Sequence, residues 1–130
     1  MAVVIREADT GGVRSFRFDA IVDGGVRGSI NVVRAPKHIH GRIGWVVRGI
    51  HVDADRRRQR IGTQLYAAAA REACRRRGQL VSTSNMRNPH AHSHDFWVKQ
   101  ARLGQAQAFA DGTYVLPCPV AELARPRSRR

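Results

Sequence analysis

Lysine, cysteine, acidic residues and long apolar runs are all scarce in this sequence of 130 residues. No apolar run approaches the roughly 20 residues of a membrane-spanning helix, and the N-terminus lacks the apolar core of a signal peptide. We therefore expect a soluble, cytoplasmic protein. Only Cys74 and Cys118 are present, without the paired spacing of a metal site, so two reduced thiols are expected.

The shortage of acidic residues gives the chain a strong positive charge. Ten acidic residues face 23 basic ones, and the net charge is +13. A charge of this size favours polyanionic partners such as nucleic acid, which the basic surface would contact nonspecifically, or a phosphorylated cofactor. The length predicts one domain at 1–118, followed by a basic, disordered tail at 119–130.

The first half of the chain predicts an antiparallel meander. Apolar and polar residues alternate over Ser15–Val22 and again over Val26–Val33, and the turn signal Asp23-Gly24-Gly25 lies between them. A third, apolar strand is expected at Ile43–Val52. No helical pattern precedes these strands.

The second half predicts two helices and shorter strands. Apolar residues recur at helical spacing over Ile61–Arg77, and Gly78 is suited to end that helix. The next strand, Leu80–Thr83, would lie parallel to the strand that ends at Val52. The remaining predicted elements are a helix at His92–Leu103 and strands at Ala106–Phe109 and Thr113–Leu116.

The stretch from Val52 to Tyr66 has the pattern of an anion site. A strand end leads into an arginine-rich loop, a glycine and an amphipathic helix. The first N–H groups of a helix have no partner within the helix, and together with its positive dipole end they attract phosphate. Guanidinium groups of Arg57, Arg58 and Arg60 would reinforce them. A solvated basic turn is the alternative interpretation.

The same residues resemble the signature of the GNAT acyltransferase superfamily, which holds the pyrophosphate of acetyl-CoA. That signature is Arg or Gln, two residues, Gly, one residue, then Gly or Ala. Arg57 takes the first position and Gly62 the last, whereas Arg60 replaces the middle glycine. Phe96-Trp97-Val98-Lys99 is a weaker match to an aromatic pair and lysine in the family's fourth helix.

The resemblance implies an α/β (α+β) fold with a GNAT-like mixed, mostly antiparallel central sheet and two main helices. The family usually carries two more helices between its first and second strands, and the N-terminal third of this sequence has no helical stretch. We expect a trimmed domain that lacks this helix pair. Its acceptor side would then be open, or completed by a second subunit in a homodimer.

The implied activity is transfer of an acetyl group from acetyl-CoA to an amine. Backbone groups of the strand end would bind the pantetheine arm, and the loop and first helical turn would bind the pyrophosphate through main-chain N–H groups. Asn88, in the histidine-containing segment near the second predicted helix, could contact the cofactor as an asparagine does in relatives. The expected cofactor-binding residues are therefore Ile50, Val52, Arg57, Arg58, Gln59, Arg60, Ile61, Gly62, Thr63 and Asn88.

The proton-transferring residues follow less directly from the resemblance. The family often uses a tyrosine in its fourth helix as the acid, and Trp97 at the matching position cannot serve, because an indole N–H forms hydrogen bonds but does not give up its proton as an acid. His94, one turn earlier, is the candidate acid, and His51 or a water is the candidate base. A surface or hydrogen-bonding role is the alternative for both histidines. The other histidines do not predict a metal site.

The acceptor is constrained mainly by the shortage of carboxylates. A cationic acceptor would require a carboxylate-lined pocket, so a neutral or acidic amine, an amino-acid derivative, or a protein- or RNA-linked amine is favoured. Arg48 lies either in the acceptor cleft or on a solvent-exposed face. Two other functions remain open, namely a non-catalytic CoA-binding protein and a basic nucleic-acid-binding module.

Overall fold

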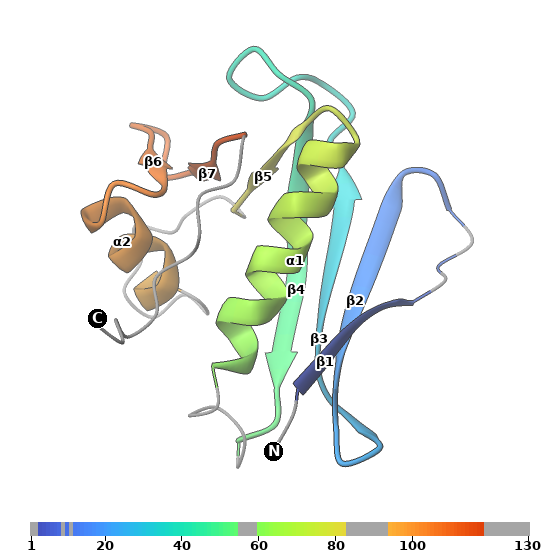
Figure 1. Ribbon diagram of the computed structural model, residues 1–130. Helices are drawn as coiled ribbons and strands as arrows, with labels where there is room; N and C mark the ends of the chain where they lie inside the picture. Colours follow the sequence, from blue (N-terminus) through green and yellow to red (C-terminus); the bar gives the residue numbers. More distant parts are fainter. Residues whose placement is uncertain (1–2, 9, 11, 55–59, 83–93, 119–130) are drawn as a thin grey trace.

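The computed structural model describes residues 3–8, 10, 12–54, 60–82 and 94–118. They form one sheet of seven strands in the order β1-β2-β3-β4-β5-β7-β6, together with two helices (Figure 1). None of the helices in this part of the chain has the length and apolar character that a membrane crossing requires. The elements are β1 (Val3–Ala8), β2 (Ser15–Val22), β3 (Gly25–Arg34), β4 (Gly44–Val52), α1 (Ile61–Arg75), β5 (Gln79–Val81), α2 (His94–Arg102), β6 (Gln107–Ala108) and β7 (Tyr114–Leu116).

The sheet is mixed and mostly antiparallel, because only β4 and β5 run parallel. This parallel pair flanks α1, as the predicted crossover requires, so the predicted fold class is confirmed. Strand β1 was not predicted, because the adjacent charges Arg6 and Glu7 break the alternation on which strand prediction depends. Residues 83–93 and the predicted tail at 119–130 lie outside the described residues.

In the described part of the chain, the helices lie on only one face of strands β1–β4. Strands β1 and β2 are antiparallel neighbours joined by residues 9–14, too few for the helix pair that the family usually carries there. Helix α1 lies across one face of β1–β4, and in the described part of the chain no helix covers the opposite face (Figure 1).

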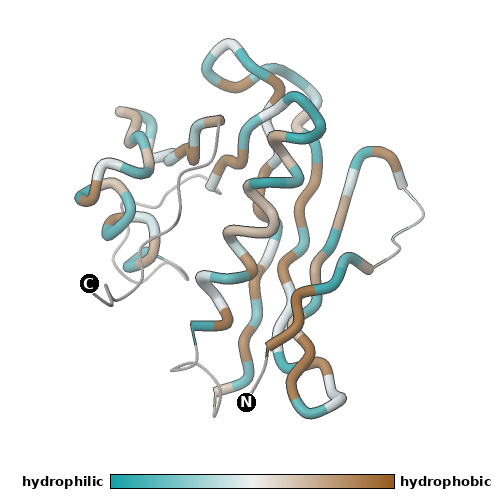
Figure 2. Tube along the Cα trace, viewed as in Figure 1, coloured by the Kyte–Doolittle hydropathy of each residue, from teal (hydrophilic) through white to brown (hydrophobic). Residues whose placement is uncertain are grey.

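The core lies between α1 and the sheet. Figure 2 shows runs of hydrophobic residues along β1–β4 and a hydrophilic cluster at the C-terminal end of α1. Gly28 permits close packing, because a Cβ atom there would lie 2.9 Å from the His51 carbonyl oxygen and 3.1 Å from Ile61 Cγ2. The fully or nearly fully buried residues include Phe16, Ala20, Val22, Ile30, Val32, Trp45, Val47, Ile61, Leu65, Ala69 and Ala73.

Helix α1 ends in a Schellman motif whose left-handed residue is Arg77 (φ 65°), and not the predicted Gly78. The Gly78 N–H donates to the Ala73 carbonyl at 2.8 Å, and the Arg77 N–H donates to the Cys74 carbonyl at 2.9 Å. Gly78 has a different role, since a Cβ atom there would lie 2.7 Å from the Trp45 ring. The missing side chain lets the turn pack against Trp45.

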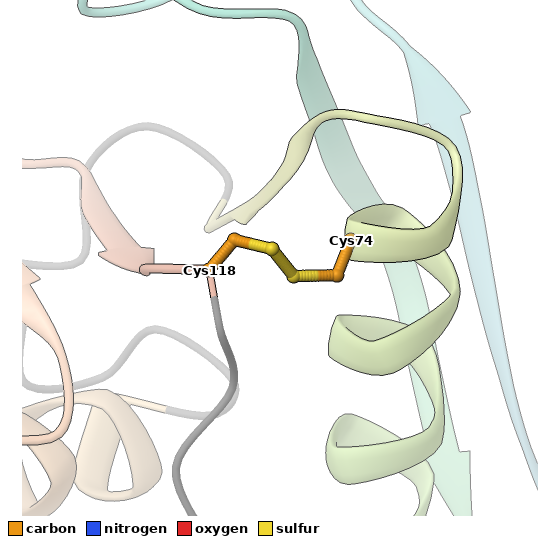
Figure 3. Close-up of a disulfide and its surroundings, with 2 residues drawn as sticks. All are labelled: Cys74 and Cys118. Atoms are coloured by element: carbon orange, nitrogen blue, oxygen red, sulfur yellow. A yellow bond between two sulfur atoms is a disulfide. The ribbon is translucent and has the colours of Figure 1, made fainter.

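A disulfide joins Cys74 in the last turn of α1 to Cys118 after β7 (Figure 3). The two Cα atoms are 5.7 Å apart, although 44 positions separate the residues in sequence. The expectation of two reduced thiols is therefore wrong. Spacing along the chain could not reveal the bond, because β7 reaches α1 only through the pairing of β5 with β7.

Candidate active site

Strands β4 and β5 separate after three residue pairs, of which the last joins Val46 to Val81. Strand β4 then continues to Val52, and no strand among the described residues pairs with the rest of that edge (Figure 1). A strand edge of this kind presents N–H and C=O groups that can pair with an extended, amide-bearing ligand.

The register with β3 determines which residues present their backbone groups on this separated edge. The Asp53 N–H donates to the Arg27 carbonyl at 2.8 Å. Backbone groups alternate between the two edges of a strand in an antiparallel ladder, so those of His51 point toward β3. Those of Ile50 and Val52 point toward the separated edge. These are the two β4 residues that we expected to bind the pantetheine arm.

A β-bulge interrupts β4 close to the point of separation. Val32 pairs with Val47 and Asn31 pairs with Gly49, so Arg48 is the extra residue of β4. Bulges increase the local twist and redirect side chains, and they are common next to active sites. The Arg48 side chain is exposed.

Helix α1 begins beside the end of β4. A Cβ atom on Gly62 would lie 3.9 Å from Val52 Cγ2, which is ordinary contact. The residue before the helix, Arg60, makes no side-chain cap hydrogen bond, and the first turn has no acidic residue. The positive end of the α1 dipole is therefore not neutralised by a side chain of the first turn, as an anionic ligand would require.

Arg60 shows how an arginine can replace the middle glycine of the signature. Its backbone is left-handed, with φ 61° and ψ 26°, a conformation that glycine adopts readily and other residues at a cost of roughly 1–2 kcal/mol. The loop therefore enters α1 through a glycine-like backbone conformation.

His51 lies on the exposed side of β4 and is paired with Asp53. The distance from His51 Nε2 to Asp53 Oδ1 is 3.2 Å, and Asp53 Oδ2 lies 3.8 Å from Arg27 Nη1. A carboxylate that holds one imidazole nitrogen leaves the other to accept a proton. Asp53 was missed as a site residue, although its position two residues after His51 places it on the same side of an extended chain.

The other predicted site residues differ in how they face this region. Ile61 is fully buried, so only its backbone can reach a ligand, whereas Gly62 and Thr63 are half-buried in the first turn of α1. His94 begins α2, and no contact joins it to His51 among the described residues. The predicted residues outside the described part of the chain are Arg57, Arg58, Gln59 and Asn88.

The aromatic pair of α2 belongs to the core. Trp97 is 1% exposed and lies edge-on to Tyr66 and to Phe96, with ring centroids 5.4 and 5.3 Å apart. Tyr66 also stacks on Phe96 at 3.9 Å. These rings attach α2 to α1, which makes their role structural.

A second charged cluster lies at the other end of α1, away from the site. Glu72 is buried and accepts hydrogen bonds from Arg75 and, at 2.6 Å, from Arg76. The hydrogen bond from Arg75, assisted by Arg76 and opposed by burial, holds the pKa of Glu72 below its ordinary value. The Arg76 guanidinium also lies over the rings of Phe16 and Trp45, at 5.0 and 5.2 Å.

A family model for the Acetyltransferase (GNAT) family matches residues 5–105 of the chain. No curated protein sequence matches this chain significantly. The match spans β1 to the segment that follows α2, and it includes both the separated edge of β4 and the start of α1.

Several solved structures are similar in fold. A transcriptional regulator from Bacillus halodurans C-125 is 18% identical with a TM-score of 0.59, over 75% of this chain and 91% of the other. The enzyme AAC(6')-Iy, in complex with a bisubstrate analogue of CoA and acetylneamine, is 18% identical with a TM-score of 0.58, over 92% and 71%. An IAA acetyltransferase from Bacillus cereus ATCC 14579 is 15% identical with a TM-score of 0.60, over 84% and 79%.

Proposed function

The chain belongs to the acetyltransferase (GNAT) family, and from this membership we propose that it moves an acetyl group from acetyl-CoA to an amine. The observation that carries the proposal is the separated edge of β4, which lies beside the start of α1 and its dipole. An extended amide chain with a diphosphate at one end suits this combination, because the edge pairs with amides and the helix start attracts phosphate. The domain that does this work spans 1–118.

Each part of the donor is assigned to residues of the site. The backbone groups of Ile50 and Val52 bind the pantetheine amides, and the first-turn N–H groups of α1 bind the diphosphate. His51 remains the proposed base and His94 the proposed acid. The remaining proposed contacts to the donor come from Arg57, Arg58, Gln59, Arg60, Ile61, Gly62, Thr63 and Asn88.

Acetyl-CoA supplies the acetyl group already activated as a thioester. Asp53 holds His51 through Nε2, so Nδ1 of His51 is the nitrogen that takes the proton of the attacking amine. His94 is the proposed donor of a proton to the leaving sulfur. Since a thiolate leaves readily near neutral pH, this second transfer contributes less than the first.

Location and assembly belong to the same proposal. We place the protein in the cytoplasm, where a disulfide such as Cys74–Cys118 is uncommon, and propose a homodimer that completes the open acceptor side. Nonspecific contact with nucleic acid through the basic surface is a further proposal based on the net charge of +13.

Non-catalytic CoA binding is the alternative function. It predicts binding of CoA without thiol release from acetyl-CoA in the presence of amines.

Charge at the start of α1 provides the test. Thr63→Glu places a carboxylate in the first turn, which suits the helix dipole but repels a diphosphate, whereas Thr63→Gln has nearly the same shape without the charge. We expect Thr63→Glu to weaken acetyl-CoA binding about tenfold or more in calorimetric titration while thermal stability is retained. Thr63→Gln should bind nearly as the wild type does. Equal acetyl-CoA affinity of both variants would contradict a diphosphate site at this turn.

A further inference from the structure

Arg48 stands where β4 and β5 separate. It is the extra residue of the bulge and lies two positions beyond Val46, the last β4 residue that pairs with β5. Its side chain is exposed, and the described residues supply it with neither an ion pair nor a hydrogen bond. Since no carboxylate of the described residues pairs with it, this guanidinium is available to a ligand.

Arg48 and His51 lie on the same face of the sheet. His51 is in register with Ser29, and Gly49 with Asn31. Arg48 is three positions before His51, so a regular strand would place the two on opposite faces, but the bulge adds one residue between Val47 and Gly49. The exposed Arg48 therefore shares the face of Gly49 and His51, and not the buried face of Val47. The five positions other than Val47 are partly or fully exposed on the face that α1 leaves uncovered. At a rise of about 3.3 Å per residue, the Cα atoms of Arg48 and His51 are about 10 Å apart along the strand.

The described carboxylates of the central strands do not favour a cationic ligand here. Asp19 is held by Arg17 at 2.8 Å, and Asp53 is held by His51 and Arg27. A cationic acceptor would therefore meet the unpaired charge of Arg48 without a free carboxylate to offset it. An anionic acceptor would gain a charge-assisted, bidentate contact.

We propose that Arg48 binds the anionic group of the acceptor, so that the preferred substrate is an amine that also carries a carboxylate or a phosphate. The inference rests on the proposed acetyl transfer and adds the chemical class of its acceptor. The anionic group pairs with Arg48, and the amine of the same molecule lies toward His51. Arg48 thus determines specificity and takes no part in the transfer of protons.

Two matched pairs of amines test this assignment, namely β-alanine with β-alaninamide and phosphoethanolamine with ethanolamine. Thiol release from acetyl-CoA gives kcat/KM for each, and the ratio of anionic to neutral amine is compared between the wild type and Arg48→Ala. We expect the ratio to fall about tenfold or more in Arg48→Ala, the size of one charge-assisted hydrogen bond. Comparing ratios removes differences in basicity between the amines. The pair with the larger loss shows whether carboxylate or phosphate is preferred.

Arg71→Ala is the matched control, because Arg71 is an exposed arginine of α1 and its loss changes the net charge equally. Its ratios should equal those of the wild type. Active wild-type enzyme whose ratios do not change in Arg48→Ala would overturn the assignment and leave acetyl transfer intact. Absence of acetyl-CoA binding to the wild type in calorimetry would instead overturn the proposed function, and the assignment with it.

Discussion

Arginines occupy the left-handed positions at both ends of α1, Arg60 before the helix and Arg77 after it. Glycine is the usual residue at such positions, since a Cβ atom there crowds the backbone. The protein thus accepts a backbone cost at each end of the helix. At Arg60 the cost falls directly beside the proposed diphosphate position.

Exchange of Arg60 for glycine separates backbone cost from side-chain function. We expect Arg60→Gly to raise the free energy of unfolding by about 0.5–1 kcal/mol, because glycine adopts this conformation without strain. Arg60→Ala removes the same guanidinium and keeps the strain, so it should be less stable than Arg60→Gly. Chemical denaturation of both variants measures the difference. Equal stabilities would show that the left-handed conformation carries no cost at this position.

Glu72 gives the stability of the fold a dependence on pH. Its pKa is lowered in the folded protein, chiefly by the hydrogen bond from Arg75, so its contribution is complete above its ordinary pKa. That contribution is lost as the pH falls from about 4.5 through the lower folded pKa. We expect Glu72→Gln to reduce the free energy of unfolding by about 1–3 kcal/mol near pH 7, with the difference shrinking in acid.

Denaturation of the wild type and Glu72→Gln across the pH range measures this effect. Glu7→Gln is the control, since Glu7 meets Arg76 only at 3.5 Å and its side chain is 44% exposed, so the loss of its charge should cost little. A Glu72→Gln deficit that stays constant down to pH 3 would assign the effect to packing and not to charge.

At the scale of elements, the stability of the last turn of α1 depends differently on the neighbouring positions Arg77 and Gly78. We expect Gly78→Ala to destabilise the protein by about 1–3 kcal/mol, because the added methyl group would overlap the Trp45 ring and the Ile43 carbonyl oxygen. Arg77→Gly should instead stabilise it by up to about 1 kcal/mol by relieving the left-handed residue. Thermal unfolding checks both signs. Equal behaviour of the two variants would contradict these separate roles.

Several elements could be predicted from the sequence because their signals are local. The alternation over Ser15–Val22 gives β2 with its observed bounds, and the turn at Asp23 and Gly24 joins it to β3. The helical spacing from Ile61 gives α1, and its position between two apolar strands gives the parallel pair. These features need only the neighbouring residues.

The geometry of the site depends on contacts between segments that are distant in sequence, so less of it could be predicted from the sequence. The bulge at Arg48 exists only relative to Asn31 and Val32 on β3, so the sequence of β4 alone does not indicate it. The end of the β4–β5 pairing at Val46 likewise depends on the path of β5. Family resemblance could suggest which residues bind the donor, but the face on which Arg48 and His51 meet required the register.

At the scale of the whole molecule, the Cys74–Cys118 bond attaches the end of the described chain to its central helix. We expect Cys118→Ser to lower the free energy of unfolding by about 2–4 kcal/mol, the usual effect of closing a loop of this length. A reducing agent should lower the melting temperature of the wild type and leave that of Cys118→Ser unchanged. Thiol titration of the denatured protein, without reduction or prior alkylation, should detect no free cysteine, and two free thiols would contradict the bond.

The same disulfide closes a covalent loop of the chain that contains β5, α2, β6 and β7, while β1–β4 lie outside the loop. A protease that cleaves one peptide bond within this loop cannot release a fragment. The nicked protein keeps its full mass under oxidising conditions. It divides into two polypeptides only on reduction. The N-terminal polypeptide contains Cys74 and ends at the cut, and the C-terminal polypeptide begins at the cut and contains Cys118.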